Sequence, residues 1–194
     1  MRFYHSSLAS DITSFRGNSH FAHQIEPSLF VAARVYFGDQ ARLDDATFFA
    51  MIPKLYTCKS DIEISKFAEF HDIGTPDIGN AGYHWAKRYQ DADIEKYRKL
   101  VPFFASERTP DEEKLERLRQ DMAEQNIVGY QYENKFEGGT AVCFMDASSV
   151  TVEMSEPIDR AEIAMIFLKM SFEETEVVND RLYLIAMRRA MFFL

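Results

Sequence analysis

The sequence predicts a mixed α+β fold, with strands near both ends of a core and helices between and after them. Three observations favour this class. Residues 127–154 alternate strand-like runs with turn residues, whereas residues 27–38 and 109–126 carry apolar side chains at helical spacing. Residues 158–193 have the pattern of two further helices. The 194 residues, 46% of them hydrophobic, suffice for one core or one core with an appendage.

The first part of the chain is predicted to hold two strands and a helix. Residues 2–6 and 20–22 are predicted as strands, separated by a loop. The helix begins near Pro27, a residue favoured in the first turn, and stops at Gly38, a residue favoured just past the end. Apolar side chains at spacings of three, four and seven form its inward face: Leu29, Ala32, Ala33 and Tyr36.

The middle of the chain is predicted to be helical. Residues 43–100 carry an apolar stripe at helical spacing: Phe48, Phe49, Ile52 and Leu55. Residues 74–82 contain three Gly and one Pro and are predicted as a loop. A capping box, Thr-Pro-Asp-Glu at 109–112, opens a helix that ends near Asn126 and buries Leu115, Leu118 and Met122.

The remaining chain is predicted as a β-rich block and then a helical hairpin. Three strands, at 127–132, 140–145 and 150–154, are joined by turns, and Pro157 closes the block. The expected organisation is one domain over residues 1–157 with a helical insert at about 39–125. Residues 158–194 form a helical hairpin packed on that domain.

Charge and composition exclude several classes of protein. The formal net charge is −9 and there is no run of Lys or Arg, which disfavours binding to a nucleic acid backbone. The acidic surface is interpreted as a solvated face, with attraction of a basic partner as the alternative. No stretch reaches the ~20 apolar residues that span a bilayer, and the N-terminus lacks a signal-peptide pattern. A cytoplasmic protein is expected.

Neither cysteine nor histidine spacing predicts a metal site or a disulfide framework. The two cysteines are too few for such a framework, and Cys143 lies in an apolar run that predicts burial. His20 and His23 are three apart, like half a zinc site, but no second pair matches them. Neither a Gly-x-Ser-x-Gly elbow nor a phosphate-binding Gly-Lys loop is present.

Three polar side chains form a candidate site. His5 ends the first strand, Glu137 precedes a Gly-Gly turn, and Tyr36 lies on the helix between them. Such a clamp could grip a ribose, stack on a ring and stabilise a developing cation. Each residue also has a structural explanation: a strand-end histidine, a core tyrosine and an exposed turn carboxylate. Asn134 is interpreted first as a turn former, with contact to a ligand as the alternative.

These segments resemble the His–Tyr–Glu branch of the ADP-ribosyltransferase-like family. Residues 127–139, IVGYQYENKFEGG, are similar to its C-terminal motif, and Asp-Ala-Ser at 146–148 looks like the Asp-x-Ser that follows it. Residues 3–7, FYHSS, look like the first strand of the family, and residues 32–36 resemble its A-x-x-Y helix. The branch includes diphtheria-like toxins, poly-ADP-ribose polymerases and small phage anti-CRISPR proteins that ADP-ribosylate their targets.

The resemblance implies a split β-sheet core and an NAD-dependent mono-ADP-ribosyltransferase that modifies a protein. It implies that His5 binds the adenine-side ribose of NAD, that Ser6 or the neighbouring backbone holds the nicotinamide amide, and that Tyr36 stacks on the nicotinamide ring. It also implies that Glu137 accepts a hydrogen bond from the 2′-hydroxyl of the nicotinamide ribose. A carboxylate at this position stabilises the oxocarbenium-like state. A toxin or phage effector acting against a host or defence protein is the corresponding biological role.

Several alternatives stay open beside this hypothesis. Lys135 stands where arginine-modifying members carry Glu or Gln, which disfavours an arginine acceptor. Phe21 is the first candidate for a second stacking aromatic, Phe37 a weaker one, and Glu133 replaces Glu137 if the turn register differs. Two other functions are an NAD glycohydrolase and a non-catalytic interaction protein that uses the acidic surface and the aromatic segment 83–89.

Overall fold

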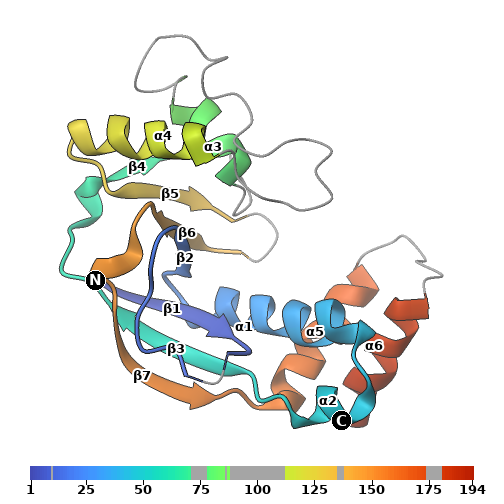
Figure 1. The fold of residues 1–194 in the computed structure, drawn as a ribbon. Helices are drawn as coiled ribbons and strands as arrows, with labels where there is room; N and C mark the ends of the chain where they lie inside the picture. Colours follow the sequence, from blue (N-terminus) through green and yellow to red (C-terminus); the bar gives the residue numbers. More distant parts are fainter. Residues whose placement is uncertain (10, 71–77, 86, 88–111, 135–137, 174–180) are drawn as a thin grey trace. The chain divides into compact units, whose positions relative to one another are not determined.

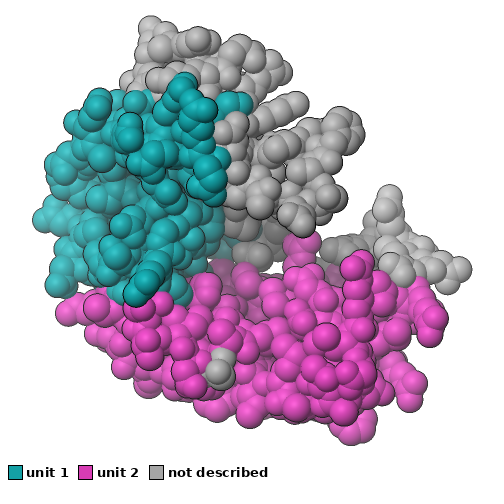
Figure 2. Space-filling model, in the orientation of Figure 1, with its two compact units in different colours: residues 1, 15–23, 60–150 teal, residues 2–14, 24–59, 151–194 magenta. Residues whose placement is uncertain are grey.

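A computed structural model describes the chain except residues 10, 71–77, 86, 88–111, 135–137 and 174–180 (Figure 1). The described chain forms two compact units, each assembled from segments that are distant in sequence (Figure 2). Unit 1 contains residues 1, 15–23 and 60–150, and unit 2 contains residues 2–14, 24–59 and 151–194. Each unit has its own strands and helices, so the predicted α+β class is confirmed.

Unit 1 contains a four-stranded mixed sheet with the order β4-β5-β6-β2. Its strands are β2 (Ser19–Ala22), β4 (Phe67–Glu69), β5 (Gly129–Glu133) and β6 (Thr140–Phe144). β5 and β2 each pair antiparallel with β6, whereas β4 pairs parallel with β5. The strands predicted at 20–22, 127–132 and 140–145 are therefore confirmed within a residue or two of their ends.

Two helices, α3 (Ile78–Trp85) and α4 (Glu112–Glu124), pack in unit 1. α4 buries the three apolar residues predicted for it, and they meet the sheet at Tyr130 and Tyr132. After α4, Asn126 adopts a left-handed φ of 58° while the Ile127 N–H donates to Met122 O, which is a helix-ending geometry. The predicted end near residue 126 is confirmed, while the capping residues 109–111 lie outside the described residues.

Unit 2 contains a three-stranded antiparallel sheet with β3 at its centre. The strands are β1 (Arg2–Ser7), β3 (Lys54–Lys59) and β7 (Thr151–Pro157). The helices are α1 (Ile25–Ala33), α2 (Asp45–Ala50), α5 (Arg160–Glu173) and α6 (Arg181–Phe192). α1 continues as a π-helical turn over Arg34–Gly38 and a 3-10 turn over Asp39–Arg42.

The helices of unit 2 form a layer on one face of its sheet. Tyr4 of β1 and Leu55 of β3 face that layer. The largest buried members of the layer are aromatic: Tyr36, Phe37, Phe48 and Phe167. Ala186 and Ala190 of α6 are fully packed, so small side chains let this helix approach closely.

The prediction that residues 43–100 are helical, and with it the helical insert at 39–125, is wrong at two places. The strands β3 and β4 lie within this part of the chain. β3 is a central strand whose residues 55–58 are all buried, so it lacks the period-two alternation that reveals a half-buried strand. β4 has only three residues, too few for any periodicity.

Two predicted boundaries are also wrong. The loop predicted at 74–82 contains the start of α3, which begins at Ile78 and incorporates two glycines. The helical path predicted to stop at Gly38 continues to Arg42 as a 3-10 turn. In both places glycine costs helical stability, yet the surrounding packing outweighs this weak local preference.

Candidate functional site

The turn between β5 and β6 forms where the sequence predicts it. The Gly138 N–H donates to Asn134 O at 2.9 Å, and the Asn134 N–H donates to Gly139 O at 3.0 Å. Gly138 and Gly139 have φ of 78° and 72°, which glycine adopts without the strain of a Cβ. Glu137 lies between them and Asn134, outside the described residues.

The two polar residues before this turn, Asn134 and Glu133, differ in solvent exposure. Asn134 is 4% exposed, so the structure gives it a buried position under the turn. Glu133 is exposed and pairs with Thr140 at the last rung of the β5–β6 ladder. Contact of Asn134 with a ligand stays a prediction, and Glu133 is a solvent-facing carboxylate one residue before the turn.

Gly129, in the motif that carries the family resemblance, has a packing reason of its own. A Cβ at this position would lie 2.0 Å from Cys143 O and 3.0 Å from the Cys143 carbonyl carbon. Real side chains never approach backbone so closely, so only glycine fits at the start of β5. The hairpin that presents the Glu137 turn therefore depends on this close approach.

His5 and Ser6 lie on opposite faces of β1, because successive side chains of a strand alternate. Ser6 is paired in register with Leu55, on the face that meets the helices. Its Oγ is buried, has no hydrogen-bond partner among the described residues, and lines a cavity of about 10 Å³ beside Ala32 and Val35. That volume is close to what one water molecule needs.

Tyr36 is a core residue in this structure. It is 0% exposed, and its ring centroid lies 4.9 Å from that of Phe37 and 4.6 Å from that of Phe48. Its hydroxyl donates to Phe48 O at 3.3 Å. Burial raises the pKa of Tyr36, an effect opposed by the positive charges of Arg160 and Arg189. The predicted inward orientation is confirmed, but no face of the ring is free for a stacked nicotinamide.

The expected clamp is therefore not formed between His5 and Tyr36. Tyr36 belongs to the helical layer on the Ser6 face of the sheet, whereas His5 points to the other face. The other aromatic candidates are also packed. Phe21 is 2% exposed and makes edge contacts with Phe15 and Phe144, and Phe37 packs against Phe167.

The aromatic residue beside His5 is Tyr56, which sequence reasoning missed. Tyr56 is the register partner of His5 across β1 and β3, and the two ring centroids are 6.5 Å apart. The Tyr56 hydroxyl donates to Ala9 O at 2.8 Å and accepts from the Ile12 N–H at 3.4 Å, which holds the segment after β1. Predicting residues 54–59 as a strand would have revealed this pair.

The surroundings of the remaining titratable candidates, two histidines and two cysteines, indicate structural roles. His20 Nδ1 lies 3.2 Å from the Tyr132 hydroxyl, and burial lowers the pKa of His23. Burial raises the pKa of Cys58 and of Cys143 to about 12, so neither thiol is a nucleophilic thiolate near neutral pH. Within the described residues, no three His, Cys, Asp or Glu side chains are grouped to hold a metal ion.

No family model, curated protein or solved structure matches this chain. Among the described residues, no helix combines the length and the apolar character that crossing a membrane requires.

Proposed function

We propose that the protein is an NAD-consuming ADP-ribosyltransferase that modifies a protein, with Glu137 as its catalytic carboxylate. The observation that carries the proposal is the β5–β6 hairpin, whose turn holds Glu137 immediately before two glycines with left-handed backbone. A Cβ at Gly138 would meet nothing within 4 Å, so the described residues leave space beside this backbone. A ligand can approach such a turn closely.

Glu137 has a defined part in the proposed reaction. The bond between the ribose C1′ of NAD and the nicotinamide nitrogen breaks, and nicotinamide leaves with the electron pair. The ribose then carries oxocarbenium character until a nucleophile of the acceptor protein adds to C1′ and loses its proton. A carboxylate that accepts a hydrogen bond from the 2′-hydroxyl stabilises this charge as it develops, as carboxylates do in glycoside hydrolysis.

In unit 2, His5 and Tyr56 support the proposal better than the predicted pair of His5 and Tyr36. His5 is half-buried at the end of β1 and offers ring nitrogens suited to a ribose hydroxyl. Tyr56 packs against the His5 ring and fixes the chain after β1 through Ala9 and Ile12. We assign Tyr56 as a positioning residue for His5.

The split β-sheet core implied by the family resemblance is part of this proposal and goes beyond the mixed α+β fold that the structure gives. An effector role against a host or defence protein follows from the resemblance to the small phage members. Lys135, two positions before Glu137 in the sequence, favours an acceptor other than arginine.

The second candidate, a non-catalytic interaction protein, is favoured by one observation. Large apolar side chains of α5 and α6 are more than half exposed: Met165, Leu184, Met191 and Phe192. Exposed apolar surface of this kind is typical of protein-binding faces. This candidate predicts that the protein binds a partner without consuming NAD.

Incubation with NAD labelled in the adenylate part and a cell lysate tests the proposal. Label transferred to a lysate protein by the wild type, and lost with His5→Ala, is the expected result. Nicotinamide release without any transfer would replace the transferase with an NAD glycohydrolase. Absence of both release and NAD binding, with partner capture retained, would establish the interaction protein instead.

A further inference from the structure

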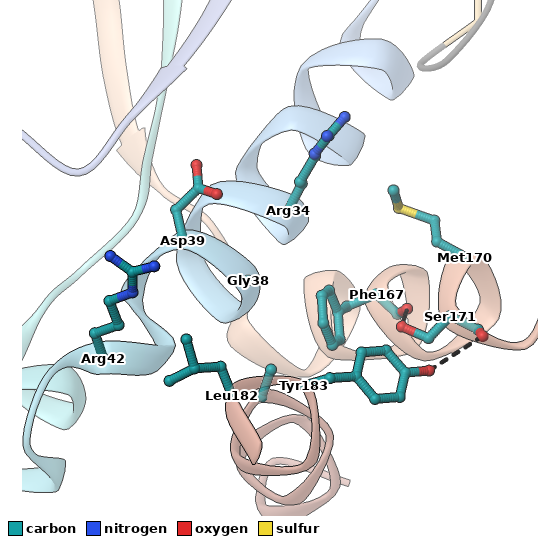
Figure 3. A pocket seen from close by; sticks show the side chains of 10 residues that line it. Arg34, Gly38, Asp39, Arg42, Phe167, Met170, Ser171, Leu182 and Tyr183 are labelled. Carbon is teal, nitrogen blue, oxygen red and sulfur yellow. Dashed lines mark hydrogen bonds between the residues drawn. The ribbon is translucent and has the colours of Figure 1, made fainter. Parts of the chain in front are cut away.

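The helical layer of unit 2 contains a cavity of about 560 Å³ that the proposed NAD chemistry does not use (Figure 3). It lies between the chain that follows α1, residues 34–42, and the helices α5 and α6. Small-molecule sites typically have volumes of about 300–1,000 Å³, so a molecule of nucleotide size fits this one. One side is polar and charged, and the other is largely aromatic and aliphatic.

The charged side consists of two arginines and one carboxylate. Arg34, Asp39 and Arg42 are exposed, and none of their three side chains makes a hydrogen bond or ion pair with a described residue. Their summed charge is positive in a chain whose formal net charge is −9. Guanidinium groups present planar donor forks that match phosphate oxygens, and two of them flanking one cavity favour a phosphate over a neutral ligand.

The opposite side offers flat and polarisable surface. Figure 3 shows the Phe167 and Tyr183 rings beside each other, and Met170 lines the cavity further along α5. The Tyr183 hydroxyl donates to Ser171 O at 3.2 Å, which fixes this ring by linking α6 to α5. Aromatic and thioether surfaces favour a planar ring over a flexible aliphatic chain. The Asp39 carboxylate supplies an acceptor for a sugar hydroxyl.

From these features we infer that the cavity binds a nucleoside monophosphate. Its phosphate would pair with Arg34 and Arg42, a ribose hydroxyl would donate to Asp39, and its base would lie against the aromatic side. The ligand would connect the turn after α1 with α5 and α6. Because it binds only the folded unit, it would also raise the unfolding temperature.

Titration calorimetry of the full chain with AMP tests this inference, with adenosine and inorganic phosphate as partial ligands. Saturable AMP binding is expected, about tenfold or more tighter than binding of either partial ligand. The double variant Arg34→Gln/Arg42→Gln should weaken AMP binding by about a hundredfold, because two charge-assisted contacts are lost. Arg188→Gln, which removes an exposed charge of α6 outside the cavity, should leave it unchanged.

A steric variant gives an independent readout. A Cβ at Gly38 would lie 3.8 Å from the Phe167 ring, in ordinary contact, so Gly38→Ala should fold and Gly38→Leu should fill the cavity. Loss of AMP binding in Gly38→Leu with an unchanged circular dichroism spectrum supports the site. Two results overturn it: no saturable AMP binding by the wild type up to about 1 mM, or an affinity unaffected by the double arginine variant.

Nucleotide binding in this cavity does not depend on the proposed turnover of NAD, so either one can be disproved without the other. AMP is also part of NAD, so binding at the site proposed for NAD has to be distinguished. His5→Ala should remove any AMP bound at the site proposed for NAD, whereas the AMP binding that depends on Arg34 and Arg42 should persist, because His5 does not line this cavity. Loss of AMP binding in His5→Ala, with retention in the arginine double variant, would move the nucleotide away from this cavity and contradict the inference.

Discussion

Arg189 donates two hydrogen bonds to Asp45 Oδ1, at 3.1 and 2.7 Å, from a side chain that is almost wholly buried. The same guanidinium donates to three backbone carbonyls, those of Gln40, Ala41 and Leu43, and lies 4.3 Å from the Phe48 ring centroid. One residue of α6 therefore satisfies the polar backbone between the 3-10 turn and α2. This polar anchor explains how an arginine is retained in an apolar layer.

Replacing Arg189 with Met should lower the free energy of unfolding by about 3 kcal/mol, because buried carbonyls lose their donor. Urea unfolding followed by circular dichroism measures the change. The neighbouring exposed Arg188→Met is the matched control and should stay within about 0.5 kcal/mol of wild type. Equal stability of the two variants would show that Arg189 is not an anchor.

Gly129→Ala should destabilise the protein by about 2 kcal/mol or more, because the added methyl overlaps the Cys143 backbone. Gly138→Ala meets no atom of a described residue but imposes a left-handed φ on a residue with a Cβ, so a loss of about 1 kcal/mol is expected. Thermal unfolding of both variants gives the comparison. A larger loss at Gly138 than at Gly129 would contradict the close approach of β5 and β6.

The sequence predicted the elements whose signals are local. The hairpin of β5 and β6 has glycines at positions of positive φ, and α4 has a clean apolar face. β3 was missed because both of its faces are buried, so its four buried residues at 55–58 show no alternation that would distinguish a strand from a helix. Its identity as a strand depends on pairing with β1 and β7, which are distant in sequence.

The candidate site was predictable only in part for the same reason. His5 at a strand end and the glycine turn after β5 follow from local patterns. The faces to which side chains point follow from register, and that register puts His5 beside Tyr56 and away from Tyr36. Once β3 was interpreted as a helix, no sequence argument could pair His5 with Tyr56.

The two cysteines should react slowly with a thiol reagent while the protein is folded. Burial raises both pKa values to about 12, so the thiolate fraction at pH 8 is far below that of a free cysteine. Absorbance after addition of Ellman's reagent should rise slowly in buffer and quickly, to two thiols per chain, in denaturant. Rapid reaction of either thiol in the folded protein would contradict its burial.

Stability should depend on pH through His23. Burial lowers its pKa in the folded protein, so the unfolded chain binds a proton more readily just below the ordinary value of 6.5. The free energy of unfolding should therefore fall as the pH decreases below about 6.5. His23→Gln should reduce this slope between pH 7 and pH 5.5. An identical slope in wild type and variant would assign the pH dependence to other groups.

Two acids of the sequence that joins β5 to β6 allow the catalytic assignment to be tested: Glu133, the last residue of β5, and Glu137. Glu133 is exposed at the end of β5, and Glu137 stands before the glycines. A change to Gln keeps the shape of either side chain while removing its charge. The two variants therefore differ only in which carboxylate is neutralised, and each serves as the control for the other.

The most direct measurement is nicotinamide release from NAD by purified wild type, Glu137→Gln and Glu133→Gln, with and without a cell lysate as acceptor. We expect release by the wild type and by Glu133→Gln. Glu137→Gln should be slower by about a hundredfold or more, which corresponds to about 3 kcal/mol of transition-state stabilisation. Equal release by Glu137→Gln and wild type, or no release by any of the three proteins, would contradict the assignment of Glu137 as the catalytic carboxylate.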